Sequence, residues 1–488
     1  MKAELREYQK NIVESALSKG NTLVVLPTGL GKTLVAFAVM ERVGGRCIFM
    51  APTKPLCEQH WQSYRELTGK EGVLITGESR NREDLWKCEA IFATPQTVRN
   101  DMRKGLVKDA SLIVFDEAHR AVGDYAYVEI AQKFDCLFLA LTASPGGKKA
   151  RIEEVVKNLK IKNIEIRAAS DEDVKGYVKN IEIEWVKVGL GPIAAEIKEL
   201  KGLLEHYAKL MSEAGFPLPL KSKAKLIEVG KKIMGIQHGM KYRLLVNYNV
   251  ALHLNHMLEL LETESVHAFL KYLDGLRAKQ GKSAAIVSRH PKVIEIEKRL
   301  KGMEHPKMGK LLELVERIRG KKVIIFAQYR EQVRHIVEKL KEKGIKAEVF
   351  IGKKEGYSRK KQEEVISRFR SGEIDIMVAS SIGEEGLDIP KVDVVVFYEP
   401  IPSEIRTIQR RGRAGRFMDG KVYVLMSEGT RDEFHYWASF TKEKKMKSIL
   451  GRMRKEMDGR ASRDRVVGAK EAPKEVKRKG QTTISDFL

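Results

Sequence analysis

The sequence predicts an α/β protein in which a helical insert separates two parallel-sheet domains. Over residues 1–166, short apolar runs alternate with helix-length segments, and a second series of the same kind occupies residues 305–430. This alternation is typical of parallel sheets whose two faces are covered by helices. Between the two series, apolar residues recur with the helical period, as at Ile193, Ile197 and Leu200.

Each series contains five runs that indicate buried strands. They are residues 21–26, 46–50, 89–93, 111–115 and 136–141 in the first series, and 321–327, 345–350, 374–379, 392–398 and 421–426 in the second. The insert contains the nearly continuous apolar stretch 242–262, which is long enough for a helix buried on most sides. We therefore expect a first domain over 1–170, a helical insert over 185–300, a second domain over 305–440, and a basic tail over 441–488.

Size and charge narrow the functional classes. A chain of 488 residues is too long for a single core, and its formal net charge of +24 favours a polyanionic partner. No apolar run approaches the roughly 18 residues of a membrane-spanning helix, and the first residues, MKAELREYQK, lack the apolar core of a signal peptide. None of the four cysteines forms a CxxC pair, which indicates reduced residues. We expect a cytoplasmic, nucleoid-associated protein with no membrane partner.

The stretch PTGLGKT, residues 27–33, follows the first strand run and opens a helical segment, as a phosphate-binding loop does. Glycines at such positions let backbone N–H groups turn toward phosphates, a lysine supplies a cation, and a hydroxyl can ligate Mg²⁺. The residues expected to bind ATP in this way are Thr28, Gly29, Gly31, Lys32 and Thr33, with Thr33 on Mg²⁺. The usual G-x-x-x-x-G-K-T spacing has glycine at position 26, which is leucine here. The alternative is an ordinary glycine-rich turn.

The acidic pair of DEAH, residues 116–119, comes directly after another strand run. Asp116 would hold Mg²⁺ through water, and Glu117 would orient and deprotonate the attacking water. The alternative is a solvated acidic turn, which the nearby phosphate loop makes less favourable. Together the two motifs predict hydrolysis of ATP, with Lys32, Asp116 and Glu117 as catalytic residues.

Weaker motifs lie at the ends of the other strand runs. TAS (142–144), APTKPL (51–56) and ATPQT (93–97) are all expected at the carboxyl edge of the sheet, where open α/β sheets bind ligands. Gln9, within LREYQ, precedes the first strand and is expected to read the adenine edge. Ser144 is a candidate for contact with a nucleic-acid strand or for coupling.

Four arginines crowd into QRRGRAGR, residues 409–416, where like charges repel unless an anion faces them. Together with the phosphate loop, DEAH and VASSIGEEGLDIP (378–390), this segment makes the chain resemble a superfamily 2 helicase over nearly all of residues 1–430. The resemblance implies two RecA-like domains with ATP between them and movement in the 3′→5′ direction. It further implies that Arg413 and Arg416 act as catalytic arginine fingers, that Gln409 lies near the γ-phosphate, and that Asp388 contacts the ribose. The alternative for the arginines is a basic helix facing nucleic acid or solvent.

The helical insert, GEEGLDIP and HPKMGKLLELV (305–315) resemble the archaeal Hef and Fanconi anaemia group M helicases. This resemblance implies a DNA helicase for forked or branched substrates in DNA repair, with the insert selecting the branch. Archaeal Hef carries a nuclease domain with the signature E-R-K-x-x-x-D after the helicase, and this signature is absent from the sequence. We therefore expect either a helicase-only relative or the helicase portion of a longer chain. The lysines of residues 220–232 either touch phosphates or form a solvated face. Two other functions remain open: a RIG-I-like ATPase that depends on double-stranded RNA, and a non-catalytic DNA-binding scaffold.

The last residues, QTTISDFL, follow a basic stretch of disordered composition. Gln481, Ile484 and Phe487 have the spacing Q-x-x-[ILM]-x-x-aromatic, which resembles the peptide that docks on the sliding clamp PCNA. Ile484 and Phe487 would share one face of a helical turn and fill an apolar pocket. The final leucine departs from the usual second aromatic residue. The alternative is an incidental apolar tail.

Overall fold

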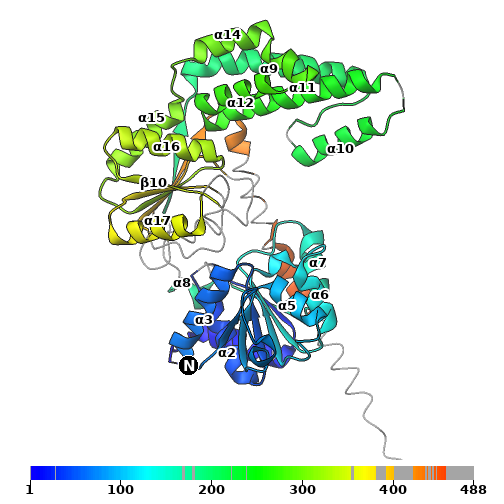
Figure 1. The fold of residues 1–488 in the computed structure, drawn as a ribbon, viewed down its shortest axis with the longest axis vertical. Coiled ribbons are helices and arrows are strands. Elements are labelled where there is room, and N and C mark those ends of the chain that lie inside the picture. The colour runs from blue at the N-terminus through cyan, green and yellow to red at the C-terminus, as the bar shows by residue number, and fades with distance from the viewer. Residues whose placement is uncertain are drawn as a thin grey trace, which may run out of the picture.

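The computed structural model describes residues 2–27, 29–167, 171–177, 182–220, 222–237, 239–352, 357–380, 392–400 and 421–434, together with 437, 441, 445–446 and 448–457. Two parallel sheets and a helical insert form three parts of the molecule (Figure 1). The predicted fold class is confirmed. Within the described residues, no helix has both the length and the apolar character needed to cross a bilayer.

The first sheet has seven parallel strands in the order β3-β4-β2-β5-β6-β1-β7. The strands are β1 (Thr22–Val25), β2 (Cys47–Met50), β3 (Val73–Ile75), β4 (Ala90–Ala93), β5 (Leu112–Phe115), β6 (Leu137–Thr142) and β7 (Asn163–Ile166). The connecting helices are α1 (Glu7–Lys19), α2 (Lys32–Val43), α3 (Lys54–Thr68), α4 (Arg82–Leu85), α5 (Pro95–Arg103), η1 (Ala118–Arg120), α6 (Ala126–Lys133), α7 (Lys149–Asn158) and α8 (Glu172–Lys175). Because the strands are parallel, their carboxyl ends share one edge, and the predicted motifs meet there.

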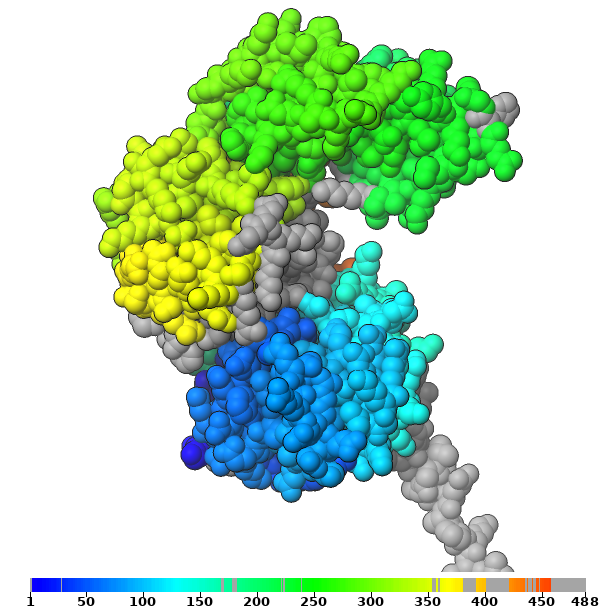
Figure 2. Space-filling view, viewed as in Figure 1, coloured from blue at the N-terminus to red at the C-terminus, as the bar shows by residue number. Residues whose placement is uncertain are grey.

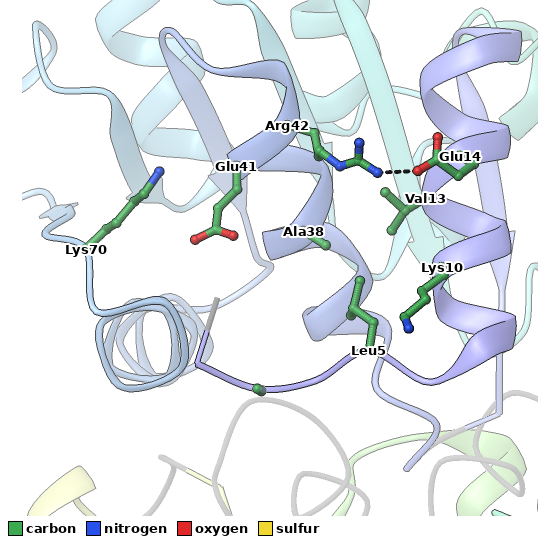
Figure 3. Close-up of a pocket in the computed structure, with 9 residues that line it drawn as sticks. Leu5, Lys10, Val13, Glu14, Ala38, Glu41, Arg42 and Lys70 are labelled. Atoms are coloured by element: carbon green, nitrogen blue, oxygen red, sulfur yellow. Dashed lines mark hydrogen bonds and ion pairs between the residues drawn. The ribbon is translucent and has the colours of Figure 1, made fainter.

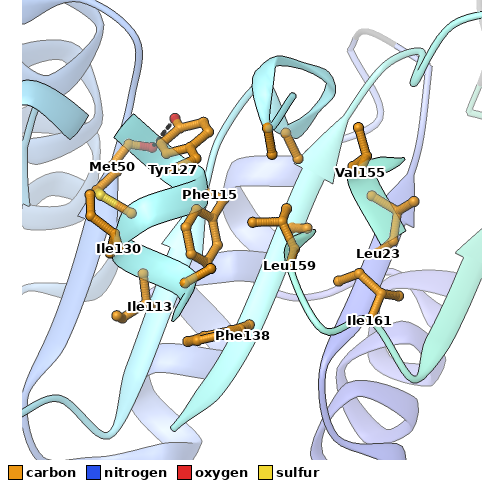
Figure 4. Packing of buried hydrophobic residues seen from close by; sticks show 14 of the residues in the cluster. Leu23, Met50, Ile113, Phe115, Tyr127, Ile130, Phe138, Val155, Leu159 and Ile161 are labelled. Carbon is orange, nitrogen blue, oxygen red and sulfur yellow. Dashed lines mark hydrogen bonds between the residues drawn. The ribbon is translucent and has the colours of Figure 1, made fainter. Parts of the chain in front are cut away.

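Apolar side chains are buried on both faces of this sheet, which is why its strands are continuous apolar runs. On one face, the Phe115 ring packs edge-on against Tyr127 and Phe138, with ring centroids 5.1 Å and 5.4 Å away (Figure 4). Each fully buried ring of this kind contributes about 1.5–3 kcal/mol relative to exposure. The core therefore fixes β5 and β6, the two strands that end in DEAH and TAS.

The second sheet has six parallel strands in the order β10-β11-β9-β12-β13-β8. They are β8 (Glu182–Val188), β9 (Val323–Phe326), β10 (Ala347–Phe350), β11 (Ile376–Ala379), β12 (Val394–Phe397) and β13 (Lys421–Ser427), and the helices are α15 (Pro306–Arg317), α16 (Arg330–Glu342) and α17 (Arg359–Ser371). Strand β8 precedes the insert in the chain but pairs with β13 from Glu182↔Lys421 to Val188↔Ser427. The insert is thus bracketed by two elements of the second domain, β8 and α15.

The insert is a helical bundle that follows β8 through η2 (Gly191–Ile193). Its helices are α9 (Ala194–Glu213), α10 (Lys223–Met234), α11 (Lys241–Glu259), α12 (Val266–Ala278), α13 (Lys282–Ser288) and α14 (Pro291–Leu300), with a π-helical turn, η3, at Leu260–Glu264. The long apolar stretch predicted as a buried helix forms α11 and this turn. Figure 1 shows α10 at the end of the insert that lies farthest from the second domain.

A buried ion pair joins the insert to the second domain. Lys307, at the start of α15, and Asp432, after β13, are both 0% exposed, and Lys307 Nζ lies 2.6 Å from Asp432 Oδ2. The same Nζ donates to the Thr263 carbonyl oxygen of the π-helical turn at 2.7 Å. Tyr398, at the end of β12, donates its hydroxyl to the Glu264 carbonyl oxygen at 3.0 Å. The base of the insert is therefore held by hydrogen bonds inside the protein.

The chain returns to the first domain after the second. Met446, Ile449, Leu450 and Met453 are buried in the core of the first sheet. An ion pair between Arg454 Nη2 and Glu165 Oε2, 3.6 Å apart, adds a polar contact on this side. Part of the segment predicted as a basic tail over 441–488 thus packs on the first domain.

Candidate nucleotide-binding site

The predicted phosphate loop connects β1 to the first residue of α2. Gly31 is the N-cap of this helix and has φ 74° and ψ 39°, and Gly29 has φ 89°; both lie in the left-handed region that favours glycine. A Cβ at Gly31 would lie 2.5 Å from the Gln9 Nε2 atom, so a side chain there would displace the Gln9 amide as well as strain the backbone. The free N–H groups at the start of α2 suit an anion. Thr28 lies outside the described residues.

Lys32 and Thr33 open helix α2. The Lys32 Nζ atom donates to the Leu26 carbonyl oxygen at 2.9 Å, within the loop that is expected to hold phosphates. The lysine therefore lies across its own loop. A phosphate oxygen would be a stronger, charged acceptor than this carbonyl.

Gln9, the predicted adenine reader, is 2% exposed and is tied to the phosphate loop. Its Oε1 accepts from the Arg6 backbone N–H at 2.9 Å, and its Nε2 donates to the Leu30 carbonyl oxygen at 3.1 Å. The Tyr8 hydroxyl donates to the same Leu30 oxygen at 2.9 Å. These bonds position the loop from α1. Adenine recognition by Gln9 stays a prediction.

Asp116 follows β5 and is buried. Its Oδ2 lies 3.1 Å from the Nε2 atom of His60 on α3, and its backbone carbonyl accepts from the Tyr127 hydroxyl at 2.6 Å. The His60 ring packs on Phe49 of β2, with ring centroids 4.7 Å apart. The carboxylate is therefore held by a neighbour that is itself held by the core, an arrangement common around metal ligands.

Glu117 has φ 50° and ψ 48°, which is unusual for a residue with a side chain. Backbone strain of this kind is concentrated at functional sites. Burial alone raises the pKa of Glu117, but the His119 imidazole, Lys32 and Arg120 outweigh burial and hold this pKa below its ordinary value. The carboxylate is thus kept ionised, and the charge of Lys32 reaches it from the phosphate loop.

His119 links DEAH to the next strand. Its Nδ1 lies 3.3 Å from Glu117 Oε2 and 3.3 Å from the Thr142 Oγ1 atom at the end of β6. Strand β6 lies between β5 and β1, and the Thr142 carbonyl accepts from the Leu26 N–H at 3.2 Å. Thr142 therefore stands between the two predicted motifs and contacts both sides.

Ser144, predicted as a contact for nucleic acid or for coupling, is buried. Its Oγ donates to the Met446 Sδ atom at 2.9 Å, and its N–H donates to Thr142 Oγ1 at 3.1 Å. TAS is thus covered by the returning C-terminal segment. A direct contact between Ser144 and a nucleic-acid strand would require this segment to move.

Sequence reasoning found the two acids of DEAH but missed His60 and His119 as their neighbours. His119 carried a usable signal, because it belongs to the motif itself. His60 carried none, since its position on α3 becomes informative only when β2 and β5 pair. In the second domain, Asp388, Gln409, Arg413 and Arg416 lie outside the described residues, and their roles stay predictions.

A surface hollow of about 650 Å³ lies between α1 and α2 (Figure 3), and none of the predicted site residues is among those that line it. Lys10 and Val13 line it from α1, and Ala38 and Arg42 from α2. Arg42 lies ten residues beyond Lys32, about 15 Å along the helix. This hollow is therefore not where the predicted catalytic residues converge.

Two family models and a solved structure match the chain. The family model "Type III restriction enzyme, res subunit" matches residues 2–147, and the model "Helicase conserved C-terminal domain" matches residues 306–418. The crystal structure of the Pyrococcus furiosus Hef helicase domain matches with a TM-score of 0.69 and 41% identity, covering 89% of this chain and 98% of that one.

Curated relatives give the same family. The Methanocaldococcus jannaschii protein MJ1505, provisionally named an ATP-dependent RNA helicase, is 39% identical over 92% of this chain and 61% of its own length. The Neurospora crassa protein named ATP-dependent DNA helicase mph1 is 34% identical over 88% of this chain and 41% of its own length. The chain thus spans less than two thirds of the length of each of these two relatives. It belongs to the Hef family of superfamily 2 helicases, together with the Mph1 and Fanconi anaemia group M proteins.

Proposed function

We propose that the chain is an ATP-driven DNA helicase or translocase that acts on forked or branched DNA, such as stalled replication forks and Holliday junctions, in DNA repair. The observation that carries the proposal is the placement of Thr142 between the two motifs, since it contacts His119 of DEAH and the Leu26 N–H just before the phosphate loop. A glycine-rich turn and an acidic turn of unrelated purpose have no reason to meet in this way.

The residues of the first domain divide the work. Backbone N–H groups from Thr28 to Thr33 receive the phosphates of ATP, and Lys32 exchanges its carbonyl partner for a phosphate oxygen. The ionised Glu117 orients the attacking water and accepts its proton. His119 holds the Glu117 carboxylate in place and also contacts the Thr142 hydroxyl, so it links this carboxylate to the end of β6.

The acid and hydroxyl at this edge fit a magnesium ion. Mg²⁺ usually keeps several waters and takes one or two carboxylates beside the substrate phosphates, so Asp116 and Thr33 are a sufficient protein contribution. Bound there, the ion would neutralise charge on the β- and γ-phosphates. His60 would keep the Asp116 carboxylate aimed at it.

The second domain completes the site in this proposal. Arg413 and Arg416 stabilise charge on the transferring phosphoryl group, Gln409 lies near the γ-phosphate, and Asp388 contacts the ribose. The support is the position of each residue in its sequence motif. Closing and opening of the cleft would then move the grip of the two domains along one strand.

The net charge of +24 supports binding to a nucleic acid. The presence of the helical insert supports the proposal that the enzyme selects branched DNA. The two domains would contact mainly backbone, which carries little sequence or junction information. The competing functions are an ATPase that depends on double-stranded RNA and a scaffold without turnover. Two of the relatives are named as RNA helicases.

One experiment separates these functions. ATP turnover of the full chain is measured with forked DNA, blunt duplex DNA and double-stranded RNA, and Glu117→Gln serves as the inactive control. We expect forked DNA to stimulate turnover most. Greater stimulation by double-stranded RNA would select the RNA-dependent ATPase, and no stimulation by any nucleic acid would select the scaffold.

We propose further that the C-terminal peptide binds the sliding clamp PCNA through Gln481, Ile484 and Phe487. These residues lie outside the described part of the chain, so the support is their spacing alone. Docking would bring the enzyme to replicating DNA, in agreement with a DNA substrate.

A further inference from the structure

The described residues include seven large apolar side chains that are strongly exposed, and four of them are concentrated at one end of the insert. These four are Ile227, Met234, Met240 and Tyr242, with 58%, 63%, 65% and 62% of their surface exposed. We call residues 222–243, which comprise α10, the turn after it and the first residues of α11, the insert tip. Isolated exposed apolar residues are ordinary, but a cluster marks a contact surface.

The exposed apolar side chains of α10 lie on the side of the helix that faces away from α11, while its other side packs on α11. Leu226 and Ile233 of α10 are buried against α11, and the Tyr248 hydroxyl donates to the Leu226 carbonyl oxygen at 2.8 Å. A Cβ at Gly230 would lie 2.8 Å from this hydroxyl, so glycine allows the close approach. Helix α10 therefore packs on α11 through this side, and Ile227 lies outside the contact and is exposed.

Cations surround the exposed apolar side chains. The insert tip, residues 222–243, contains six lysines and arginines and one glutamate, a net charge of +5. On α10, Lys231 lies between Ile227 and Met234 in the i, i+4, i+7 pattern of one helix face. Lys282 of α13 places its Nζ 5.5 Å from the centre of the Tyr242 ring. The tip thus combines positive charge with one exposed aromatic side chain and three other exposed apolar side chains.

We propose that the insert tip binds unpaired nucleotides at the branch point of the DNA. Lysines would contact the backbone phosphates, the Tyr242 ring would stack on a base, and Met234 or Met240 would pack beside it. Unpaired bases expose apolar faces together with phosphates, which is the combination that this surface matches. Duplex DNA would use only the cations, since its bases are stacked inside. The inference rests on the proposed function, because it names how the insert recognises a branch.

Other occupants fit less well. A protein partner that covered this surface would have to leave most of the positive charge unpaired or supply an acidic face of its own. A membrane surface would require a wide apolar stripe on α10, but its outer face alternates apolar and charged residues. In Figure 1 α10 lies at the end of the insert away from the second domain, and Figure 2 shows this end of the insert at the surface of the molecule.

The test compares binding of the full chain, without ATP, to three fluorescent substrates: a single strand, a fork with unpaired arms, and a blunt duplex. Tyr242→Ala should weaken binding to the single strand and the fork by about 5- to 150-fold, because stacking on an aromatic ring is typically worth about 1–3 kcal/mol per base. Binding to the blunt duplex should change by less than about twofold. Tyr242→Phe is the matched control and should bind all three substrates normally.

Charge variants separate the two contributions. The double variant Lys231→Gln and Lys232→Gln should weaken binding to all three substrates to a similar extent. It should also reduce the salt dependence of binding. Melting temperatures of all variants should match the wild type, because the substituted side chains are exposed.

Three results would overturn the inference. Tyr242→Ala could weaken binding to the duplex as much as binding to the single strand, or it could leave binding to the single strand unchanged. It could also dissociate an oligomer in light scattering, which would show that a second copy covers the tip. Failure of the proposed function is distinguishable. It would appear as equal affinity of the wild type for fork and duplex, while the single-strand comparison would still decide the role of Tyr242.

Discussion

Replacing Lys307 with methionine should destabilise the second domain by about 3–5 kcal/mol. The variant keeps most of the side-chain length but removes the ammonium group, and this leaves the Asp432 carboxylate buried without its cation. It also removes the hydrogen bond to the Thr263 carbonyl oxygen, so the insert loses a contact at its base. The magnitude follows from burial, since both side chains of the ion pair are 0% exposed.

The assay is thermal unfolding of the full chain followed by circular dichroism. A loss of 3–5 kcal/mol corresponds to a decrease of roughly 10 °C in the transition of a domain of this size. Lys310→Met is the matched control on the same helix, because Lys310 forms an exposed ion pair with Glu313 and should change stability by less than about 0.5 kcal/mol. Removing both charges with Lys307→Met and Asp432→Leu should recover a large part of the loss.

A loss below about 1 kcal/mol for Lys307→Met, or a loss equal to that of Lys310→Met, would refute this reasoning. It would mean that water reaches Asp432 or that the carboxyl group becomes protonated without cost. The double variant distinguishes the two charges from simple packing, because a packing defect at Lys307 would not be relieved by a change at Asp432.

Further predictions concern catalysis, pH and the clamp. Lys32→Ala or Glu117→Gln should abolish ATP hydrolysis and leave DNA binding largely intact; near-normal turnover in either would contradict the assigned roles. Arg416→Ala should reduce turnover by about 10³-fold with a much smaller effect on ATP binding, and a change in DNA affinity alone would make it a DNA contact. Burial raises the pKa of Glu264 well above its ordinary value, so stability should fall as pH rises above about 4.5, and Glu264→Gln should remove this decline in melting temperature. A peptide of the last eight residues should bind PCNA, and its Phe487→Ala version should not; equal titration curves would exclude the clamp.

The ten strand runs predicted from the sequence are all present, and nine of them form strands that are almost wholly buried and therefore mainly apolar. The tenth, β10, lies at an edge of its sheet, and its Glu348 and Val349 are only half-buried. The strands that sequence reasoning missed, β3, β7 and β8, each lie at an edge of their sheet. Edge strands have fewer neighbours, and β8, EIEWVKV, alternates polar and apolar residues accordingly. Its partner β13 lies more than 230 residues later in the chain, so no pattern in the nearby sequence indicates that the two strands pair.

The part of the candidate site that could be predicted from the sequence is the part whose residues lie in contiguous motifs. The phosphate loop and DEAH require particular residues at fixed spacing, and the parallel sheet then brings their strand ends together without further information. The contacts that tune the site come from elsewhere. His60 reaches Asp116 from α3, and Met446 reaches Ser144 from a segment some 300 residues away.

The fold also constrains how the insert tip can influence ATP turnover. Helix α11 has 19 residues and is therefore about 28 Å long, and it connects the tip to the buried junction with the second domain. At this junction Arg431 donates to the Asn255 Oδ1 atom at 2.9 Å and pairs with Glu262 Oε2 at 3.2 Å, next to the buried pair of Lys307. Close-packed, hydrogen-bonded junctions do not deform gradually, so the insert and the second domain should move as one body. A ligand at the tip can then alter turnover only by favouring one placement of that body against the first domain, because it must bind two arrangements with different affinity to shift their balance.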